Sequence, residues 1–600
     1  MVHYYKLRPL LTLLFLSVFV SSKAQDIEYS LSMPEPHTHY FEVEMKVSNL
    51  DKSEKLKGKK IIEFKLPVWT PGSYLIREYA KNVEGFEAFA DKKLKSYKTS
   101  KNTWTVETNG KNSVSLKYRV YAFELTVRTS FLDDTHGYLN GGNVFMYVPE
   151  LMNQPSSIKI NPYKGWTSVS TGLEKISATE FIYSAPNYDM VVDSPIEIGT
   201  HKELSFTEMG VPHKIAMYSN TKLEYDEQTV IDAYKKVVRA ATDVVGEHPC
   251  KNYTFIVHHL PNIGGGLEHL NSTTCQTSTS AYASDAAFKG FMGLIAHEYF
   301  HLWNVKRIRP IALGPFDYEK ENYTNMLWVS EGITNYYEDN LLRKAGMISE
   351  SEYQTQLLAG IIGIENAPGQ RVQSVADASW DAWIKFYRPN ENSNNSTISY
   401  YNKGGVLGNL LNMYVISETK GKKTIDDIFK VLWNEYYKKL DRGYTDEEFK
   451  KVCESVTGSN MDFFFDNYIY DTKPIDYNSF FEKFGTELVN ENANTKTPYF
   501  GANLRGTMVA SVTRGSGAYN GGINVNDEIV EVDGKKNVTI SAYVSGKNIG
   551  DVINVTVKRS GQLFTYPITI TANPSVKYVI KKKDNISKTQ QMLYDKWMMN

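Results

Sequence analysis

Residues 291–301 read Phe-Met-Gly-Leu-Ile-Ala-His-Glu-Tyr-Phe-His, and the fold of the middle of the chain is inferred from them. His297 and His301 are four residues apart, so on a helix they share one face and both imidazoles can reach one ion. The flanking residues are apolar, which predicts a buried helix, and buried histidines need a partner such as a metal. Glu298 lies next to the first histidine, within reach of a water on that ion. We therefore predict zinc, with His297 and His301 as ligands and Glu298 as the catalytic base.

A third protein ligand is expected, because a catalytic zinc keeps three protein ligands and leaves the fourth position to water. Glu331 lies 30 residues after His301, inside a second helical pattern. A lone carboxylate in an apolar stretch needs a compensating cation, so Glu331 is the predicted third ligand of one zinc per chain. The three-histidine alternative fails, because positions 304 and 307 are Asn and Arg rather than Gly and His.

Size and charge limit the other classes of function. A chain of 600 residues implies roughly three or four domains. The 67 basic and 68 acidic side chains give a formal net charge of −1, so no nucleic-acid partner is expected. Three cysteines are too few for a disulfide framework. Cys250 and Cys275 either form a disulfide or remain buried small side chains.

The first 24 residues are typical of an export signal. Lys6 and Arg8 precede an apolar run over residues 10–20, and Ser22-Lys23-Ala24 offers a cleavage site. The run is too short for a comfortable transmembrane span. We therefore expect a mature chain that begins near Gln25, has no stable membrane span, and is periplasmic or extracellular.

Hydrophobic periodicity divides the mature chain, and the predicted fold class is multidomain α+β. Residues 25–206 alternate apolar and polar positions, as at 40–47 and 113–120, which predicts a β-sandwich-like domain. Residues 207–485 are mainly helical, with one strand at 254–259. Residues 486–576 return to short strands, and residues 577–600 form a charged C-terminal tail. The candidate helices cover residues 225–245, 286–304, 327–344 and 353–362, with a further block at 404–472.

Five motifs follow one another along the chain. They are Pro67–Tyr74, Gly264–His269, His297–His301, Trp328–Tyr337 and Tyr400–Gly404. In this order they resemble the glycyl aminopeptidase family of gluzincin metallopeptidases, and the resemblance covers nearly the whole mature chain. It implies an N-terminal β domain, a thermolysin-like, mainly α catalytic domain and a C-terminal PDZ domain. It also implies an aminopeptidase that acts on peptides and prefers small N-terminal residues such as Gly or Ala.

Two motifs acquire roles through this resemblance. Gly264–His269 is similar to the exopeptidase segment of related zinc aminopeptidases, although Leu-Glu-His replaces their Met-Glu-Asn. It implies that Glu268 binds the free α-amine, while Gly265 and Gly266 let the backbone lie beside the substrate. Tyr401 resembles the tyrosine that stabilises the tetrahedral intermediate. Pro67–Tyr74, judged on its residues alone, is interpreted as a stiff packing loop.

The C-terminal module resembles a PDZ domain at residues 499–504 and 521–529, with Asn526 where glycine is usual. PDZ domains capture C-terminal or extended peptides by strand addition, so a C-terminal peptide ligand is an implied partner. Two alternatives to the aminopeptidase remain open. One is an endopeptidase of the same chemistry, in which Glu268 matters little. The other is a peptide-binding PDZ receptor with a non-catalytic zinc domain.

Overall fold

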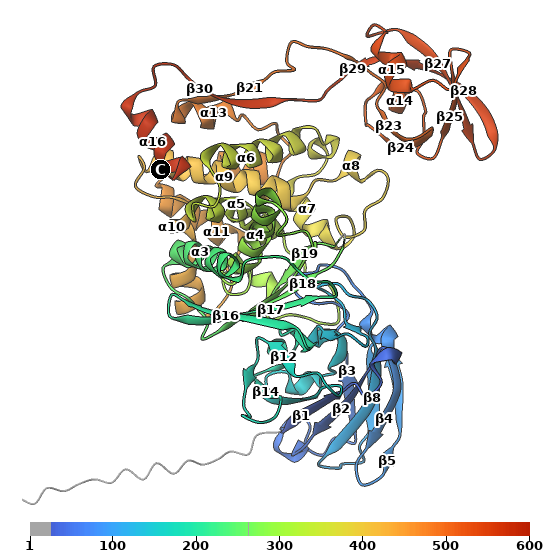
Figure 1. Ribbon diagram of the computed structural model, residues 1–600, viewed down its shortest axis with the longest axis vertical. Coiled ribbons are helices and arrows are strands. Elements are labelled where there is room, and N and C mark those ends of the chain that lie inside the picture. Colours follow the sequence, from blue (N-terminus) through green and yellow to red (C-terminus); the bar gives the residue numbers. More distant parts are fainter. Residues whose placement is uncertain (1–25, 262, 600) are drawn as a thin grey trace, which may run out of the picture.

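The N-terminal part of the chain is β-rich, as predicted (blue and teal in Figure 1). The computed structural model describes residues 26–261 and 263–599, so the predicted export signal lies outside the described residues. An eight-stranded sheet has the order β13-β14-β11-β1-β2-β8-β4-β5. Its strands β2 (Tyr40–Val47) and β8 (Val114–Tyr121) reproduce the alternating runs read from the sequence. Their buried faces share one core with a three-stranded and a four-stranded sheet.

The other elements of this part are short strands and two single-turn helices. They are β1 (Ile27–Ser32), β3 (Ile61–Lys65), β4 (Val83–Phe89), β5 (Lys93–Leu94), β6 (Ser96–Ser100), β7 (Thr103–Glu107), β9 (Phe131–Leu132), β10 (Gly137–Leu139), β11 (Ser156–Asn161), β12 (Ser168–Thr171), β13 (Glu174–Lys175), β14 (Ile182–Ala185), β15 (Ile196–Gly199), α1 (Gly141–Val144) and α2 (Tyr188–Val192).

A five-stranded mixed sheet connects the N-terminal part to the helices, in the order β16-β17-β18-β20-β19. β16 (Lys202–Glu208) crosses the predicted division at residue 206, because its hydrogen bonds are to β17 (Val211–Ser219). The central strand β18 (Tyr253–His259) is buried at every residue, since the sheet is covered on both faces. Helices lie on one side and the N-terminal sheets on the other (Figure 1). β20 (Ser272–Thr277) and the edge strand β19 (Gly265–Glu268) complete it.

The middle of the chain is helical, again as predicted. Its helices are α3 (Glu227–Val245), α4 (Asp285–Phe300), α5 (Thr334–Lys344), α6 (Glu350–Glu365), α7 (Val375–Trp380), α8 (Ser393–Ser396), α9 (Tyr400–Glu418), α10 (Ile425–Val431), α11 (Asp446–Thr457), α12 (Asp462–Phe464) and α13 (Asn478–Phe481). Two boundaries differ from the sequence prediction. The helix expected over 286–304 ends at Phe300, and the one expected over 327–344 begins with a π-helical turn at Trp328–Ile333.

The C-terminal module is a small β domain set apart from the helices (Figure 1). It touches the helical part through Asn395, whose amide donates to the Val512 carbonyl at 2.8 Å. Its elements are β22 (Pro498–Tyr499), β23 (Ala502–Arg505), β24 (Met508–Val512), β25 (Glu528–Val532), β26 (Lys535–Lys536), β27 (Val552–Arg559), β28 (Gln562–Thr569), β29 (Thr571–Ala572), α14 (Gly517–Asn520) and α15 (Ile540–Ser545).

Residues 577–600, interpreted from the sequence as a charged tail, instead contain packed secondary structure. β30 (Tyr578–Lys582) pairs with β21 (Thr486–Asn490), and α16 (Lys588–Met598) returns to the helical part. Trp597 on α16 is fully buried there. Burial of a large aromatic ring outweighs the solvation of a few lysines, so this segment is not the free tail that its charged run suggested.

Two further points concern the cysteines and membrane-spanning helices. The three cysteines are free and buried, so Cys250 and Cys275 do not form a disulfide. Within the described residues, no helix has the length and apolar character needed to cross a membrane.

Candidate metal centre

His297, His301 and Glu331 lie together, as the sequence predicted. The two histidine Nε2 atoms are 3.1 Å apart, and a Glu331 carboxylate oxygen lies 3.2 Å from that of His301 and 3.8 Å from that of His297. All three side chains are buried. Two imidazole nitrogens and a carboxylate that face one another in a buried site form a donor set suited to a divalent transition metal.

The outward nitrogen of each histidine also has a partner. His301 Nδ1 lies 2.9 Å from the carbonyl oxygen of Asn304, and His297 Nδ1 lies 3.4 Å from the Glu338 carboxylate. Contacts of this kind fix the ring orientation and leave Nε2 free to bind a metal. Glu331 Oε1 and Glu298 Oε2 are buried with no hydrogen-bond donor, as expected for oxygens that face a cation or a bound water. The residues therefore fit a metal.

Burial and neighbouring charges together shift the pKa values of Glu298 and Glu331. Burial alone would raise the pKa of Glu331, but the neighbouring histidines outweigh it and lower the pKa to about 2. For Glu298, burial is the largest cause and raises the pKa to about 7, with the charges of Glu268 and Glu331 acting in the same direction. The two histidines oppose that rise. Glu331 is thus held as a carboxylate, while Glu298 titrates near neutral pH, where a general base is most effective.

The π-helical turn that carries Glu331 is stabilised by Asn304. The Asn304 amide nitrogen donates to the carbonyls of Val329 and Ser330 at 2.8 and 3.2 Å, and to Thr334 Oγ1 at 2.9 Å. The same residue offers its carbonyl to His301, so it joins the two metal-binding segments. π-helical turns are frequent at functional sites. The sequence reasoning missed Asn304, although it had noted that an asparagine stands at this position.

Two glycines bring the Glu331 turn against α9. A Cβ atom on Gly332 would lie 2.5 Å from the Cα of Gly404, so the two backbones touch where only glycine fits. This crossing brings the start of α9 to the metal centre. The ring of Tyr401 lies 6.3 Å from that of His297, nearly parallel to it. The neighbouring Tyr400 is fully buried, so Tyr401 is the tyrosine beside the centre.

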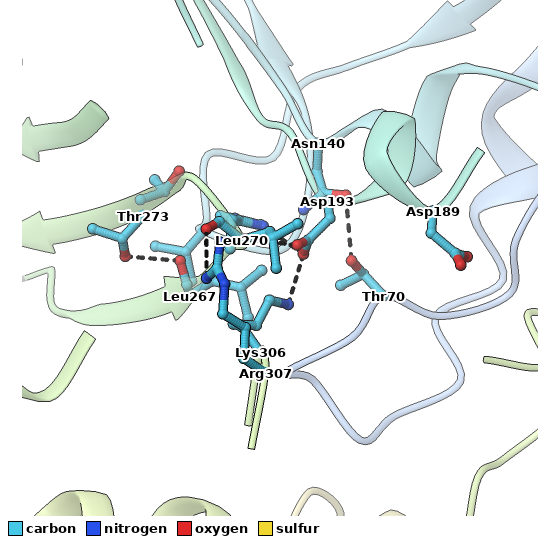
Figure 2. Close-up of polar contacts among 12 residues, drawn as sticks. Thr70, Asn140, Asp189, Asp193, Leu267, Leu270, Thr273, Lys306 and Arg307 are labelled. Atoms are coloured by element: carbon cyan, nitrogen blue, oxygen red, sulfur yellow. Dashed lines mark hydrogen bonds and ion pairs between the residues drawn. The ribbon is translucent and has the colours of Figure 1, made fainter. Parts of the chain in front are cut away.

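Glu268 at the end of β19 also reaches the centre. Carboxylate oxygens of Glu268 and Glu298 and a ring nitrogen of His301 all lie within 4.8 Å of one another. Figure 2 shows how the following turn is held: the Leu270 amide donates to Asp193 at 2.7 Å, and Lys306 pairs with the same carboxylate at 2.7 Å. Asp193 comes from the N-terminal part, which therefore supports the segment that carries Glu268.

The Pro67–Tyr74 loop is more than the packing loop expected from its residues. Gly72 has φ of +83°, and a Cβ atom there would lie 2.6 Å from both carboxylate oxygens of Glu268. Tyr74 is buried, and its pKa is raised first by burial and then by the charges of Glu331 and Glu268. The loop thus forms one wall of the site. No local sequence signal links residues so far apart along the chain.

Two family models match the chain. Residues 28–200 match the M61 N-terminal domain, and residues 290–407 match the M61 glycyl aminopeptidase. The chain thus carries both domains of the M61 peptidase family. With its His-His-Glu centre it is a zinc metallopeptidase.

Two solved structures resemble this M61 peptidase over most of its length. A crystal structure of an aminopeptidase N family protein from Idiomarina loihiensis is 27% identical, covers 95% of this chain and 100% of its own, and has a TM-score of 0.85. An M1 zinc metallopeptidase from Deinococcus radiodurans is 12% identical, with 72% and 90% covered and a TM-score of 0.46. The comparison with curated proteins gave no match.

Gly266 of the M61 peptidase contacts the predicted base. A Cβ atom on Gly266 would lie 2.0 Å from Glu298 Oε1, so Gly266→Ala must displace that carboxylate. We expect kcat to fall about 100-fold with zinc still bound, because a shift of about 1 Å costs that much in catalysis. Gly290→Ala, on the exposed side of α4 with nothing within 4 Å of the new Cβ, is the matched control. Unchanged turnover in Gly266→Ala, measured beside zinc content, would contradict this geometry.

A second buried group, His136, Glu197 and His258, also has metal-ligand chemistry. The Glu197 carboxylate lies 2.7 Å from His136 Nδ1 and 2.9 Å from His258 Nε2. The outward nitrogens of these histidines have no partner, unlike those of His297 and His301. We therefore interpret the group as a hydrogen-bonded bridge between the N-terminal part and β18.

Proposed function

We propose that this M61 peptidase is a zinc-dependent aminopeptidase that removes N-terminal residues from peptides. One zinc per chain would be held by His297, His301 and Glu331. The observation that carries the proposal is the position of Glu268, whose carboxylate lies within 4.8 Å of Glu298 and His301 atoms. A carboxylate so close to the reaction centre suits the ammonium group of a substrate whose first peptide bond is cleaved. An endopeptidase would need that space for the preceding residues.

Each site residue has a defined task in this mechanism. Zinc, when bound, supplies Lewis acidity that lowers the pKa of water towards about 7 and polarises a carbonyl. Glu298 accepts the proton of the attacking water and passes it to the leaving amine. The Tyr401 hydroxyl donates a hydrogen bond to the developing oxyanion. Gly265, on the edge strand β19, offers its backbone to the substrate, whereas Gly266 makes room for Glu298.

Three finer proposals accompany this one. The glycyl aminopeptidase model matched by residues 290–407 supports a preference for small N-terminal residues such as Gly or Ala. The C-terminal module is proposed to be PDZ-like and to bind a peptide C terminus, which its edge strand β23 would allow by strand addition. Export to the periplasm or the cell exterior is proposed from the first 24 residues alone.

The aminopeptidase proposal is tested with peptides that have free or acetylated N termini. We expect the wild type to cleave only the free form, and Glu268→Gln to lower its kcat/KM by about 10- to 100-fold, because a charge-assisted contact with the ammonium is lost. Zinc content should not change. Equal cleavage of acetylated peptides would favour the endopeptidase alternative. A zinc-loaded protein that cleaves neither would favour the peptide-binding receptor.

A further inference from the structure

Arg128 of the N-terminal part lies on a firmly held loop. The loop follows β8, and the backbone at Arg128 makes three hydrogen bonds. Its N–H donates to Thr126 Oγ1 at 3.1 Å, and its carbonyl accepts from the Tyr79 hydroxyl at 3.0 Å and from Asn143 Nδ2 at 3.1 Å. The backbone at Arg128 is therefore held in place independently of the side chain.

The guanidinium of Arg128 has no partner within the described residues. Its Nε is buried without an acceptor, and no described carboxylate lies within ion-pair distance of it. By contrast, Arg119 of the same part pairs with Glu84 at 2.8 Å. A buried N–H that is left unpaired carries a desolvation penalty, so an arginine of this kind is expected where a ligand completes its hydrogen bonds.

The loop of Arg128 lies beside β20, the strand that pairs with β19 and its Glu268. Gln276 Nε2 on β20 donates to the Leu125 carbonyl at 3.3 Å, and the Tyr138 hydroxyl lies 3.3 Å from the Val127 carbonyl and 3.0 Å from Thr274 Oγ1. Burial would lower the pKa of Arg128, but the hydroxyls of Tyr387 and Tyr401 and the carboxylates of Glu298 and Glu268 raise it above its ordinary value. Those four groups surround the site described above, and Tyr387 also donates to the Gly72 carbonyl at 3.5 Å. The positive charge of Arg128 is therefore near both site carboxylates without pairing with either.

Two opposite charges consequently lie near one metal centre. Glu268 suits the ammonium group of a substrate, and the unpaired guanidinium suits a carboxylate, which it can bind through two parallel N–H···O bonds. We propose that Arg128 binds the C-terminal carboxylate of dipeptides and similarly short peptides whose amine is held by Glu268. The inference rests on the proposed aminopeptidase function and names its substrate class. Arg128 is then a specificity-determining residue that the N-terminal part supplies.

The test compares a glycyl dipeptide with its C-terminal amide, for example Gly-Phe with Gly-Phe-NH₂. The two differ only in the group that Arg128 would bind. We expect Arg128→Gln to lower kcat/KM for the acid by about 10- to 100-fold, through KM, and to leave the amide within about 3-fold. Arg128→Lys should retain part of the preference, since it keeps the charge but not the fork. Arg119→Gln is the matched control and should alter neither substrate.

Several outcomes would overturn the inference. An equal loss on acid and amide would mean that Arg128 contacts a group common to both, such as a peptide carbonyl or the oxyanion. No loss on either would mean that it has no role in recognition. Binding of both peptides to zinc-loaded Glu298→Gln, with and without Arg128→Gln, asks the same question without turnover. Acid-selective binding that needs Arg128, in a wild type that hydrolyses neither peptide, would reject the proposed function and keep this inference.

Discussion

Glu298→Gln is expected to lower kcat by about 10³- to 10⁴-fold while the protein still binds one zinc. Glutamine has the shape of glutamate but cannot accept the proton of water at neutral pH. Glu298 is placed by contacts that do not depend on its charge: it lies on the buried α4, and Gly266 packs directly against its carboxylate. The substitution should therefore remove the chemistry and leave the architecture intact.

Turnover of Gly-Phe-NH₂ and bound zinc, measured on the same preparations, test this prediction. Glu352→Gln provides a matched control, because Glu352 pairs with Lys289 on the outer side of α4. Loss of zinc together with activity would mean that Glu298 is a ligand. That result has a structural basis, since Glu268, Glu298 and His301 form an alternative ligand group. If Glu298→Gln keeps both its activity and its zinc, another residue must act as the base.

The features that could be predicted from the sequence are those that depend on local periodicity. The spacing of His297 and His301 requires only one helix, and the alternating runs at 40–47 and 113–120 require only that one face of each strand be buried. Glu331 could be selected because a carboxylate in an apolar stretch is costly without a cation. The structure brings these residues together, within helices and strands close to the predicted bounds.

The rest of the site depends on contacts between distant segments, which no local pattern encodes. Asn304 looked like a departure from another zinc motif, yet it joins His301 to the Glu331 turn. Gly72 belongs to a β domain in which the sequence indicated no catalytic residue, yet the fold places it against Glu268. Arg128, for which we propose a role in substrate binding, comes from the same domain. The C-terminal run of lysines suggested a free tail, because charge is visible in the sequence and the docking of Trp597 is not.

The N-terminal part is therefore a component of the active site rather than an appendage. It supplies Gly72 against Glu268, Asp193 as the acceptor for the following turn, and Arg128, whose positive charge acts on Glu268 and Glu298. The contacts of Gly72 and Asp193 hold the segment of Glu268, whereas His297, His301 and Glu331 all come from the helical part. This division separates chemistry from recognition, so changes in the β domain should alter substrate preference more than zinc affinity.

Glu331→Gln is expected to weaken zinc binding by at least about 100-fold, more than any other single carboxylate change at the site. The substitution removes the negative charge of the ligand set and leaves His297 and His301 facing each other at 3.1 Å. Glu338→Gln is a comparison variant for which we expect a smaller loss of zinc affinity. Glu338 contacts the outward nitrogen of His297, at 3.4 Å, so its loss should weaken zinc binding by about 10-fold, at the low end for outer contacts.

Zinc retained by each variant in competition with a chelator measures this order directly. If Glu331→Gln and Glu338→Gln weaken binding equally, Glu331 is not a direct ligand, and the alternative group with Glu268 becomes the better assignment. The two assignments differ at a second position, because only in the alternative does Glu268→Gln release zinc. Retention of zinc by Glu268→Gln, with its loss from Glu331→Gln, would leave Glu268 free to bind the substrate amine, as an aminopeptidase requires.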